Sequence, residues 1–319
     1  MPNPPLAYAG TWGPAKMKKR HHHYVWKHYL EAWVTDGRVR CMRHGSIFPG
    51  GLLQVAVQKD FYRFKPLSTL EVAFLQMFID KSRPEGRETL LGWLHTFKSI
   101  SAMAAAFERL PFKSPADERV FEEVLSNLEE DYHSAVEGGA IAHLDSLRRG
   151  NADFLSSQDE FSKFIYFMSV QYFRTKKRLS ATLAAVKETG GVRVEHVWPV
   201  LRHIFAINGG AVFARHRRDV RVTFLEAGPG LDFVTGDQPV INTYAIGKKT
   251  GAVEDLEHYY PVTPTRAVLI SLGVSRESRV LSEEEVRFYN CAMAQAADEQ
   301  LYGICDKTLL DSWAARSDG

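Results

Sequence analysis

The chain has 319 residues, of which 45% are hydrophobic, and this composition is ample for a large apolar core. At about 150 residues per domain, that length fits two lobes or one large domain. Lys and Arg number 40 against 38 Asp and Glu, so the net charge of +2 lacks the strong basic excess of obligate nucleic-acid-binding proteins. Any basic surface must therefore be local.

The cysteines and the opening residues bear on the cellular compartment. Only three cysteines occur, Cys41, Cys291 and Cys305, and no C-x-x-C pair suggests a disulfide framework or a zinc cage. The opening residues lack the apolar stretch of a signal peptide, and no window approaches the roughly 18 apolar residues of a membrane span. We expect a cytoplasmic protein without a membrane segment. Its oligomeric state is not defined by the sequence.

The N-terminal part predicts an arm, a short helix and a small sheet. Residues 1–20 are rich in proline and end in a basic run, which predicts an extended arm. From Trp26 to Trp33 the apolar residues follow helical spacing, and the helix should end before Asp36. The alternating pattern that follows predicts a minor sheet that continues to Phe61-Tyr62.

The middle, about 68–218, has the apolar stripes of helices, and four to six helices fit there. Ser114-Pro115 followed by acidic residues is a good helix start. The pairs Gly190-Gly191 and Gly209-Gly210 are predicted breaks between helices.

The C-terminal part changes to strand patterns. Four segments predict an antiparallel β meander: 220–227, 231–235, 259–264 and 266–272. Ser282 and the acidic residues after it predict the start of a final helix that runs to Gln300, and a short strand follows. We therefore expect an α+β fold. In it residues 21–319 form a single domain with a helical lobe, about 68–218, and a mixed β lobe built from 21–67 and 219–319.

Three consecutive histidines, His21, His22 and His23, precede the first helix. Imidazoles titrate near neutral pH, so these residues are candidates for a metal pair or a general acid/base. On an extended segment His22 points away from His21 and His23. The alternatives are a fortuitous surface run and a structural histidine bonded to the backbone.

Asp60 and Asp237 are the candidate carboxylates. Asp60 precedes two aromatic residues, where an Asp often holds a turn. Asp237 lies between Gly236 and a Gln-Pro pair, so a stiff loop presents it at a strand end, where binding and catalytic carboxylates are often displayed. A plain turn is the alternative for both.

Polar residues also interrupt one helical stripe, which comprises Phe164, Phe167, Gln171, Arg174 and Arg178. A guanidinium on a stripe that faces the core requires an anionic partner, because an unpaired buried charge costs several kcal/mol. That partner is either internal, such as Asp237, or the phosphate or carboxylate of a ligand.

These segments together resemble a known family. The resemblance rests on six short motifs in the family's order across about residues 21–303: His22 to Val25 with Tyr29-Leu30, Asp60 to Tyr62, Gln171 to Thr175, Thr235 to Pro239, Tyr260 to Pro264, and Asn290 to Tyr302. The chain is similar to the bacterial domain-of-unknown-function family 4238. It departs from the family at Trp26, where the family has proline, and at Gly236, where it has serine. The resemblance supports the map of the site and assigns no activity.

We therefore expect one polar site with His22, His23, Asp237 and Arg174 as catalytic residues, and with four ligand-binding residues: Asp60, Gln171, Thr175 and Arg178. The leading hypothesis is a hydrolase of phosphodiesters, such as a nuclease of a bacterial conflict or defence system. A histidine would act as general acid/base, Arg174 would stabilise phosphate charge, and a divalent metal ion would be held by His21, His23 or Asp237.

Three local basic clusters would attract nucleic acid or a nucleotide: 16–20, 174–178 and 215–218. Two other hypotheses stay open. One is a non-catalytic binding or regulatory module for a nucleotide, a peptide or a partner protein, and the other is a buried charge network that only stabilises the fold. Motifs of P-loop NTPases, dinucleotide-binding folds, zincins and α/β-hydrolases are absent from the sequence.

Overall fold

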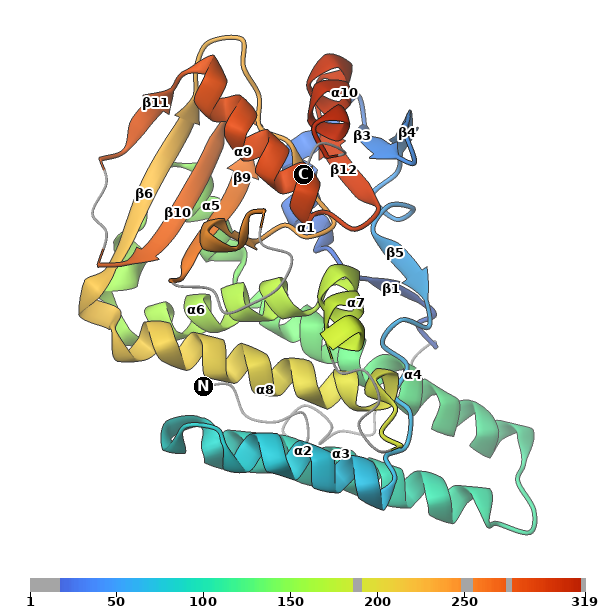
Figure 1. Ribbon diagram of the computed structural model, residues 1–319. Helices are drawn as coiled ribbons and strands as arrows, with labels where there is room; N and C mark the ends of the chain where they lie inside the picture. The colour runs from blue at the N-terminus through green and yellow to red at the C-terminus, as the bar shows by residue number, and fades with distance from the viewer. Residues whose placement is uncertain (1–17, 186–190, 248–254, 274–276, 317–319) are drawn as a thin grey trace.

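The structure is a computed structural model that describes residues 18–185, 191–247, 255–273 and 277–316. The long helices of the middle of the chain gather at one end of the molecule, and the sheets lie at the other together with α9 and α10 (Figure 1). This arrangement confirms the predicted α+β class, with a helical middle, a C-terminal β region and a late helix.

The N-terminal elements are β1 (His21–His23), α1 (Lys27–Leu30), a 3₁₀ turn (Glu31–Trp33), β2 (Val34–Thr35), β3 (Arg38–Arg43), β4 (Ser46–Gly50) and β5 (Val57–Lys59). β1 and β5 form a two-stranded antiparallel ribbon. β3 pairs with β2 and β4 and also with β12 (Gln300–Gly303), a strand from the C-terminal end. The minor sheet is therefore shared by both ends of the chain. Phe61 and Tyr62 lie in a turn instead of a strand, and residues 1–17 of the predicted arm lie outside the described residues.

The helical middle consists of α2 (Thr69–Asp80), α3 (Pro84–Glu108), α4 (Pro115–Gly138), α5 (Ile141–Arg148), a 3₁₀ turn (Asp153–Ser156), α6 (Gln158–Phe173), α7 (Lys176–Ala185), α8 (Val194–Arg215) and a 3₁₀ turn (Arg217–Asp219). The described part of this region thus holds seven α-helices, more than the four to six expected, and the two shortest are α5 with 8 residues and α7 with 10. Ser114 caps α4 through a capping box, as predicted. α6 ends at Phe173, so Arg178 lies on the next helix and does not continue the α6 stripe.

The C-terminal elements are β6 (Val220–Ala227), β7 (Thr235–Gly236), β8 (Ile241–Asn242), a 3₁₀ turn (Thr243–Ala245), β9 (Glu257–Thr263), β10 (Arg266–Leu272), β11 (Arg279–Leu281), α9 (Glu283–Ala296), β12 (Gln300–Gly303) and α10 (Asp306–Ala314). One sheet has the strand order β11-β6-β10-β9-β8, and it is antiparallel except for the parallel β11–β6 pair. The predicted strand 231–235 belongs to the other sheet, where only Thr235 and Gly236 pair with β12.

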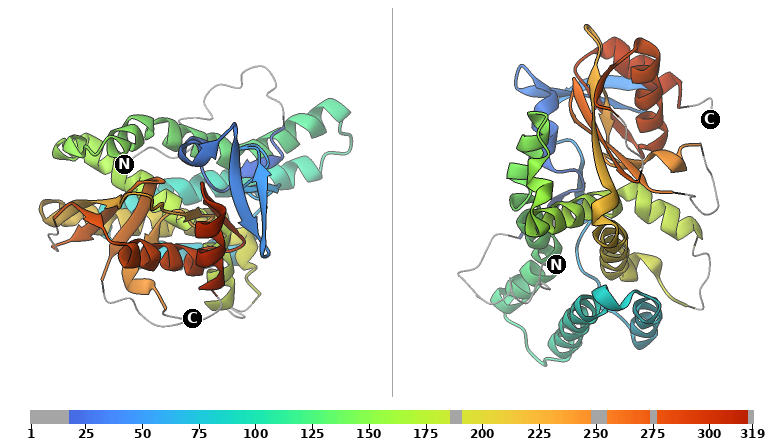
Figure 2. Two further views of the ribbon diagram at one scale, coloured as in Figure 1. Left: turned by 90° about the horizontal axis from the view of Figure 1, so that it is seen from above. Right: turned by 90° about the vertical axis from the view of Figure 1, so that its left-hand side faces the viewer.

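The five-stranded C-terminal sheet is buried on both faces, because α5 and α6 cover one face and α9 covers the other (Figure 2). Successive side chains of β10 point to opposite faces of the sheet. Val268 and Ile270 therefore join the core with α6, whereas Ala267 and Leu269 join the core with α9. This packing brings the C-terminal end of α6 against the strands.

α8 is the central helix of the helical layer and packs against α2, α3, α6 and α7. By length and composition alone it passes as a membrane span, but 61% of its apolar window is buried inside the protein. It therefore behaves as the core helix of a soluble protein. The predicted break at Gly209-Gly210 was wrong: both glycines lie inside α8, and the Cα of Gly210 approaches α6 closely, where an added Cβ would lie 3.4 Å from Ser169 Oγ.

Candidate active site

A buried polar face runs along α4. Glu129, His133 and Glu137 recur every four residues, so they lie one above another on the side of α4 that faces α6 and α8. Each of these residues is at most 8% exposed. Glu130, beside them, is only partly buried. An apolar stripe at the same spacing would be an ordinary core, so titratable groups here require a specific reason.

Arg174, at the C-terminal end of α6, is 1% exposed and joins the α4 face to the N-terminal strands. Its guanidinium donates to a Glu137 carboxylate oxygen and to the His23 carbonyl oxygen, and its Nε lies 3.0 Å from the hydroxyl of Tyr62. Gln171 Nε2 also approaches the same Glu137 oxygen, at 3.5 Å. The internal anionic partner of Arg174 is therefore Glu137, not Asp237.

A second guanidinium reaches the same face from α8. Arg202 pairs with Glu129, and His203 Nε2 lies 3.2 Å from the same carboxylate. The His203 ring stacks on Trp93 of α3 with centroids 4.0 Å apart. The Tyr62 ring receives the Arg202 guanidinium at 4.3 Å from its centroid. Tyr62 is thus in contact with both guanidiniums.

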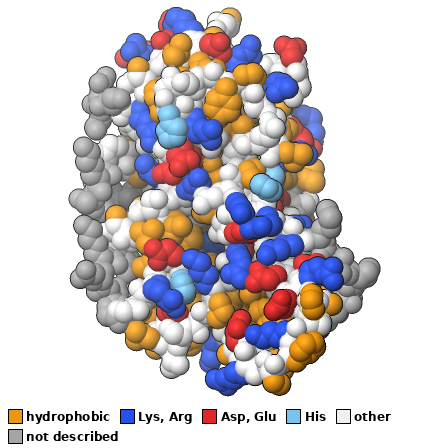
Figure 3. All heavy atoms as spheres, turned by 90° about the vertical axis from the view of Figure 1, so that its right-hand side faces the viewer, with side chains coloured by type: hydrophobic (Ala, Val, Ile, Leu, Met, Phe, Trp, Pro, Cys, Tyr) orange, Lys and Arg blue, Asp and Glu red, His pale blue; other side chains and the backbone are white. Residues whose placement is uncertain are grey.

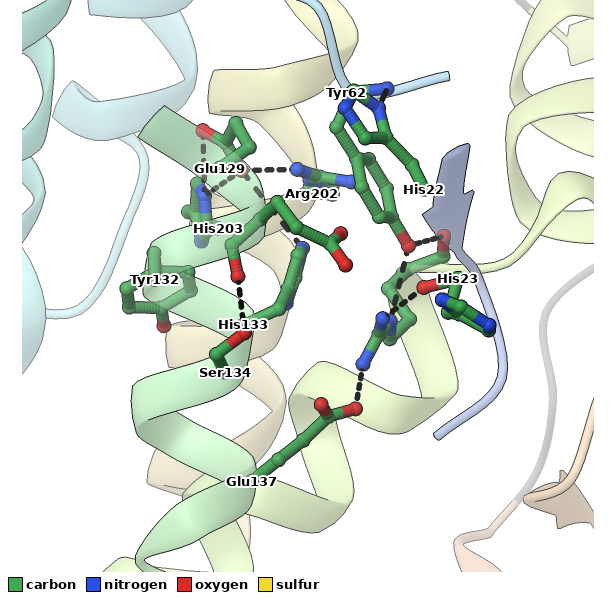
Figure 4. Close-up of polar contacts among 12 residues, drawn as sticks. His22, His23, Tyr62, Glu129, Tyr132, His133, Ser134, Glu137, Arg202 and His203 are labelled. Carbon is green, nitrogen blue, oxygen red and sulfur yellow. Dashed lines mark hydrogen bonds and ion pairs between the residues drawn. The ribbon is translucent and has the colours of Figure 1, made fainter. Parts of the chain in front are cut away.

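His133 occupies the middle of this cluster (Figure 4). Its ring lies 4.7 Å from that of Tyr62, and its Nε2 lies 3.9 Å from a Glu129 oxygen, beyond hydrogen-bond distance. Neither ring nitrogen has a hydrogen-bond partner among the described residues, and one carboxylate oxygen of Glu130 also has none. Buried polar atoms without partners cost about 1–3 kcal/mol each, so they tend to mark functional positions.

Burial sets the protonation of these groups. It raises the pKa of Glu137 to about 7, against the opposing effect of Arg174. Burial also raises the pKa of Glu130. The pKa of His133 falls far below its ordinary value, first through burial and then through repulsion by Arg174 and Arg202, so His133 is neutral at pH 7. Burial acts to raise the pKa of Glu129, but Arg202 and His203 outweigh it, and that carboxylate is charged.

The structure brings only part of the predicted site into this cluster. Arg174 and Gln171 lie in it, and His23 contributes its carbonyl oxygen. The His23 ring instead lies 3.3 Å from the Leu52 carbonyl oxygen. Both nitrogens of His22 are occupied, because Nδ1 accepts the Tyr62 backbone N–H at 2.7 Å and Nε2 lies 3.0 Å from the Lys19 carbonyl oxygen. His22 therefore positions Tyr62.

Asp237 lies elsewhere. Its carboxylate accepts the backbone N–H groups of Asp298, Glu299 and Gln300 at 2.6, 2.7 and 3.0 Å, so it holds the turn between α9 and β12. Burial raises its pKa to about 6 although these N–H groups favour the charged form. This geometry corresponds to the turn interpretation that the sequence left open.

The other predicted ligand-binding residues are also separate from the cluster. Asp60 is partly exposed, forms an ion pair with Arg20 at 2.8 Å and adopts a positive φ of 55°. The Thr175 hydroxyl donates to the Gln238 side chain. Arg178 stacks on Tyr172. The candidate metal ligands His21, His23 and Asp237 do not converge, and the described residues hold no group of three or more metal-ligating side chains.

Acidic neighbours neutralise much of the predicted basic surface. Lys18 pairs with Glu122, Lys19 with Asp131, Lys176 with Glu299, and Arg215 with Glu85, all at 2.7–3.1 Å. Lys16 lies outside the described residues. Figure 3 shows Lys and Arg side chains across the middle of one face with acidic side chains among them. On the face shown in Figure 3, the described Lys and Arg residues therefore do not form a continuous basic track.

The sequence interpretation missed six residues of the cluster: Glu129, Glu130, His133, Glu137, Arg202 and His203. A signal was present in the Glu-x-x-x-His-x-x-x-Glu spacing of residues 129–137. A second signal was the Arg202-His203 pair inside the otherwise apolar stretch of α8.

Comparison with known families confirms the predicted family membership. A family described as "Protein of unknown function (DUF4238)" matches residues 21–306, nearly the whole chain. No curated protein and no solved structure matches it. The matched range includes every residue of the buried cluster, from His22 to His203. The chain therefore belongs to the DUF4238 family.

Proposed function

We propose that the protein hydrolyses a phosphodiester at the cluster formed by Glu130, His133, Glu137, Arg174 and Arg202. The observation that carries the proposal is the buried imidazole of His133, whose ring nitrogens have no hydrogen-bond partner among the described residues, together with one carboxylate oxygen of Glu130 that also lacks a partner there, both beside two guanidiniums. Guanidiniums are suited to the charge of a phosphate, and carboxyl groups with raised pKa values are suited to proton transfer near neutral pH. No other cluster among the described residues combines these features.

The proposed reaction needs one base and one acid. Water attacks phosphorus and forms a P–O bond while its proton passes to the Glu130 carboxylate. The P–O bond to the leaving group breaks, and the leaving oxygen takes the proton of the Glu137 carboxylic acid. The products are a phosphate monoester and an alcohol. Arg174, Arg202 and the N–H of neutral His133 stabilise the charge on the phosphoryl oxygens.

The pKa values support these roles. A group is an effective acid or base when its pKa lies near the working pH, and burial places Glu137 at about 7. Glu130 and Glu137 also repel each other's charge, which favours one proton shared between two carboxyl groups. Glu130 is partly exposed as a residue, whereas its carboxylate oxygen without a partner is buried.

The paired state of the basic clusters favours a small or flexible substrate over a long duplex. We therefore propose a nucleotide or a single-stranded nucleic acid as substrate, and a nuclease of a bacterial conflict or defence system is the form that suits this chemistry. We also place the protein in the cytoplasm, where such substrates occur.

A second candidate is a binding module that recognises a nucleotide, a peptide or a partner without turnover. It is favoured by the saturation of Arg174, since all three guanidinium nitrogens already have protein partners. A catalytic Arg174 must exchange at least one of them for substrate.

The test is hydrolysis of single-stranded RNA, single-stranded DNA and bis(p-nitrophenyl) phosphate by the wild type and by Glu130→Gln, Glu137→Gln and His133→Gln. Loss of an acid or base is expected to lower kcat by about 100-fold or more. His143→Gln is the matched control, because His143 is equally buried but pairs with Glu160, outside the cluster. The assays are repeated with a chelator, which is expected to leave the rate unchanged.

Three results separate the candidates. Hydrolysis that depends on Glu130 and Glu137 supports the enzyme. Nucleotide binding without turnover by the wild type supports the module. Hydrolysis that survives in all three cluster variants excludes this cluster as the catalytic centre.

A further inference from the structure

Three polar side chains meet at the junction of α6, α7 and β9, apart from the buried cluster. The Arg178 guanidinium lies 3.8 Å from the centroid of the Tyr172 ring. The other neighbour of that ring is the imidazole of His258, stacked at 5.3 Å with an interplanar angle of 23°. Phe213 of α8 closes the apolar side, with its centroid 5.2 Å from that of His258.

None of the three polar groups has a hydrogen-bond partner for its side chain among the described residues, and Arg178 has no ion pair there. Burial leaves Arg178 Nε without a hydrogen bond. Lys176, on the same helix, differs from Arg178 in this respect, because it forms an ion pair with Glu299 at 3.1 Å. A buried donor nitrogen without a partner is unfavourable, so the fold keeps Arg178 Nε in this position at a cost.

The charge state of the surroundings favours an anion. Burial and then Arg178 itself lower the pKa of His258 to about 3, so the imidazole is neutral at pH 7. The site therefore presents one positive charge, a phenol hydroxyl and a neutral imidazole. Arg178 and Tyr172 are only partly buried, so a ligand can reach them from solvent.

We propose that Arg178, Tyr172 and His258 form a second binding site, which takes a small ligand through a phosphate or carboxylate group. The guanidinium binds two oxygens of the anion as a fork, and the hydroxyl and the imidazole add single hydrogen bonds. The packed aromatic rings hold these groups in place before the ligand arrives, which lowers the entropy lost on binding.

The second site is physically separate from the buried cluster. Gln238 fixes this end of α6, because it accepts from the Thr175 hydroxyl and donates to the Tyr172 carbonyl oxygen at 3.1 Å. The C-terminal end of α6 thus directs Arg174 to the cluster and Tyr172 to the second site. Binding at the second site does not depend on the proposed hydrolysis.

The test is calorimetric titration of the full chain with inorganic phosphate and, separately, with acetate. Saturable binding is expected for the wild type, and the anion that binds more tightly identifies the phosphate or the carboxylate source. Arg178→Gln is expected to weaken binding by about tenfold or more, because hydrogen bonds to a charged group are lost. Arg178→Lys keeps the charge without the fork and is expected to fall between the two.

Arg218→Gln is the matched control, because this exposed arginine has no ion pair among the described residues and lies far from α7 in the chain. A thermal melt of each variant identifies any loss of folding. Equal affinity in the wild type and Arg178→Gln, or no saturable binding of either anion, overturns the proposal. Glu137→Gln is expected to leave this binding unchanged, so failure of the hydrolase proposal is seen separately.

Discussion

At the scale of single residues, the central contact of the cluster is the buried ion pair between Arg174 and Glu137. A buried ion pair contributes little net stability, yet removal of one partner leaves the other charge without compensation. Arg174 also bonds the His23 carbonyl oxygen and the Tyr62 hydroxyl. One side chain thus connects α4, α6 and β1, and its removal affects all three.

Arg174→Met is therefore expected to lower the free energy of unfolding by about 3–5 kcal/mol, the range for breaking a buried pair. The measurement is chemical denaturation at pH 7. Arg178→Met is the control: it removes a guanidinium that has no ion pair among the described residues, so it is expected to change stability by less than about 1 kcal/mol. Equal effects of the two substitutions would contradict the interpretation of Arg174.

Glu137 also predicts how stability depends on pH. Its pKa rises from 4.5 to about 7 on folding, so the folded state binds this proton more tightly than the unfolded chain. The resulting stabilisation is complete below pH 4.5 and is lost as the pH rises through 7. Glu137→Gln is expected to remove this contribution, and melting temperatures from pH 5 to pH 8 measure it. If the melting temperatures of the wild type and of Glu137→Gln depended on pH in the same way, Glu137 would have an ordinary pKa in the folded protein.

At the scale of elements, the contact between α6 and α8 explains why two glycines are tolerated in a helix. Glycine at a helix interior costs about 0.5–1 kcal/mol relative to alanine. Gly210 is buried against α6. A Cβ added to it would lie 3.4 Å from Ser169 Oγ and 3.8 Å from Ile165 Cγ2. α6 and α8 thus pack closely here with room for no more than a Cβ, and the same contact brings Arg174 and Arg202 into one cluster.

Gly210→Ala is expected to be neutral or to stabilise by up to about 1 kcal/mol, because the Cβ fits and the helix gains propensity. Gly210→Leu is expected to destabilise by about 1–3 kcal/mol, because the larger side chain must displace α6. Denaturant unfolding of both variants measures the difference. A stable Gly210→Leu protein would mean that the helices are free to separate.

At the scale of the whole molecule, the sequence predicted the features that local patterns determine. It did not predict contacts between residues far apart in the chain. Capping residues such as Ser114 and Ser282 and the apolar stripes gave the helix starts and the α+β class. The partnership of Arg174 with Glu137 joins residues 37 positions apart, and β12 reaches back to β3, so no local pattern contains either contact. The need for an anion near Arg174 followed from physics, but the identity of that anion required the fold.

Asp237 shows the same limit, and it carries the last prediction. The loop pattern indicated a displayed carboxylate, which local sequence leaves equally suited to catalysis and to a turn. In the structure the carboxylate holds three backbone N–H groups at the start of β12, the strand that lies between β3 and β7. Asp237 therefore stabilises the sheet shared by the two ends of the chain.

Asp237→Ala is expected to destabilise the protein by about 1–3 kcal/mol for each donor that stays buried without a partner. Asp237→Asn, which keeps one acceptor oxygen, is expected to lose less. If Asp237 acts only through the fold, hydrolysis per folded molecule stays at the wild-type level in both variants, as measured below their melting temperatures. A fully folded Asp237→Asn protein without activity would instead indicate a catalytic role for Asp237, because the fold would be intact while the chemistry is lost.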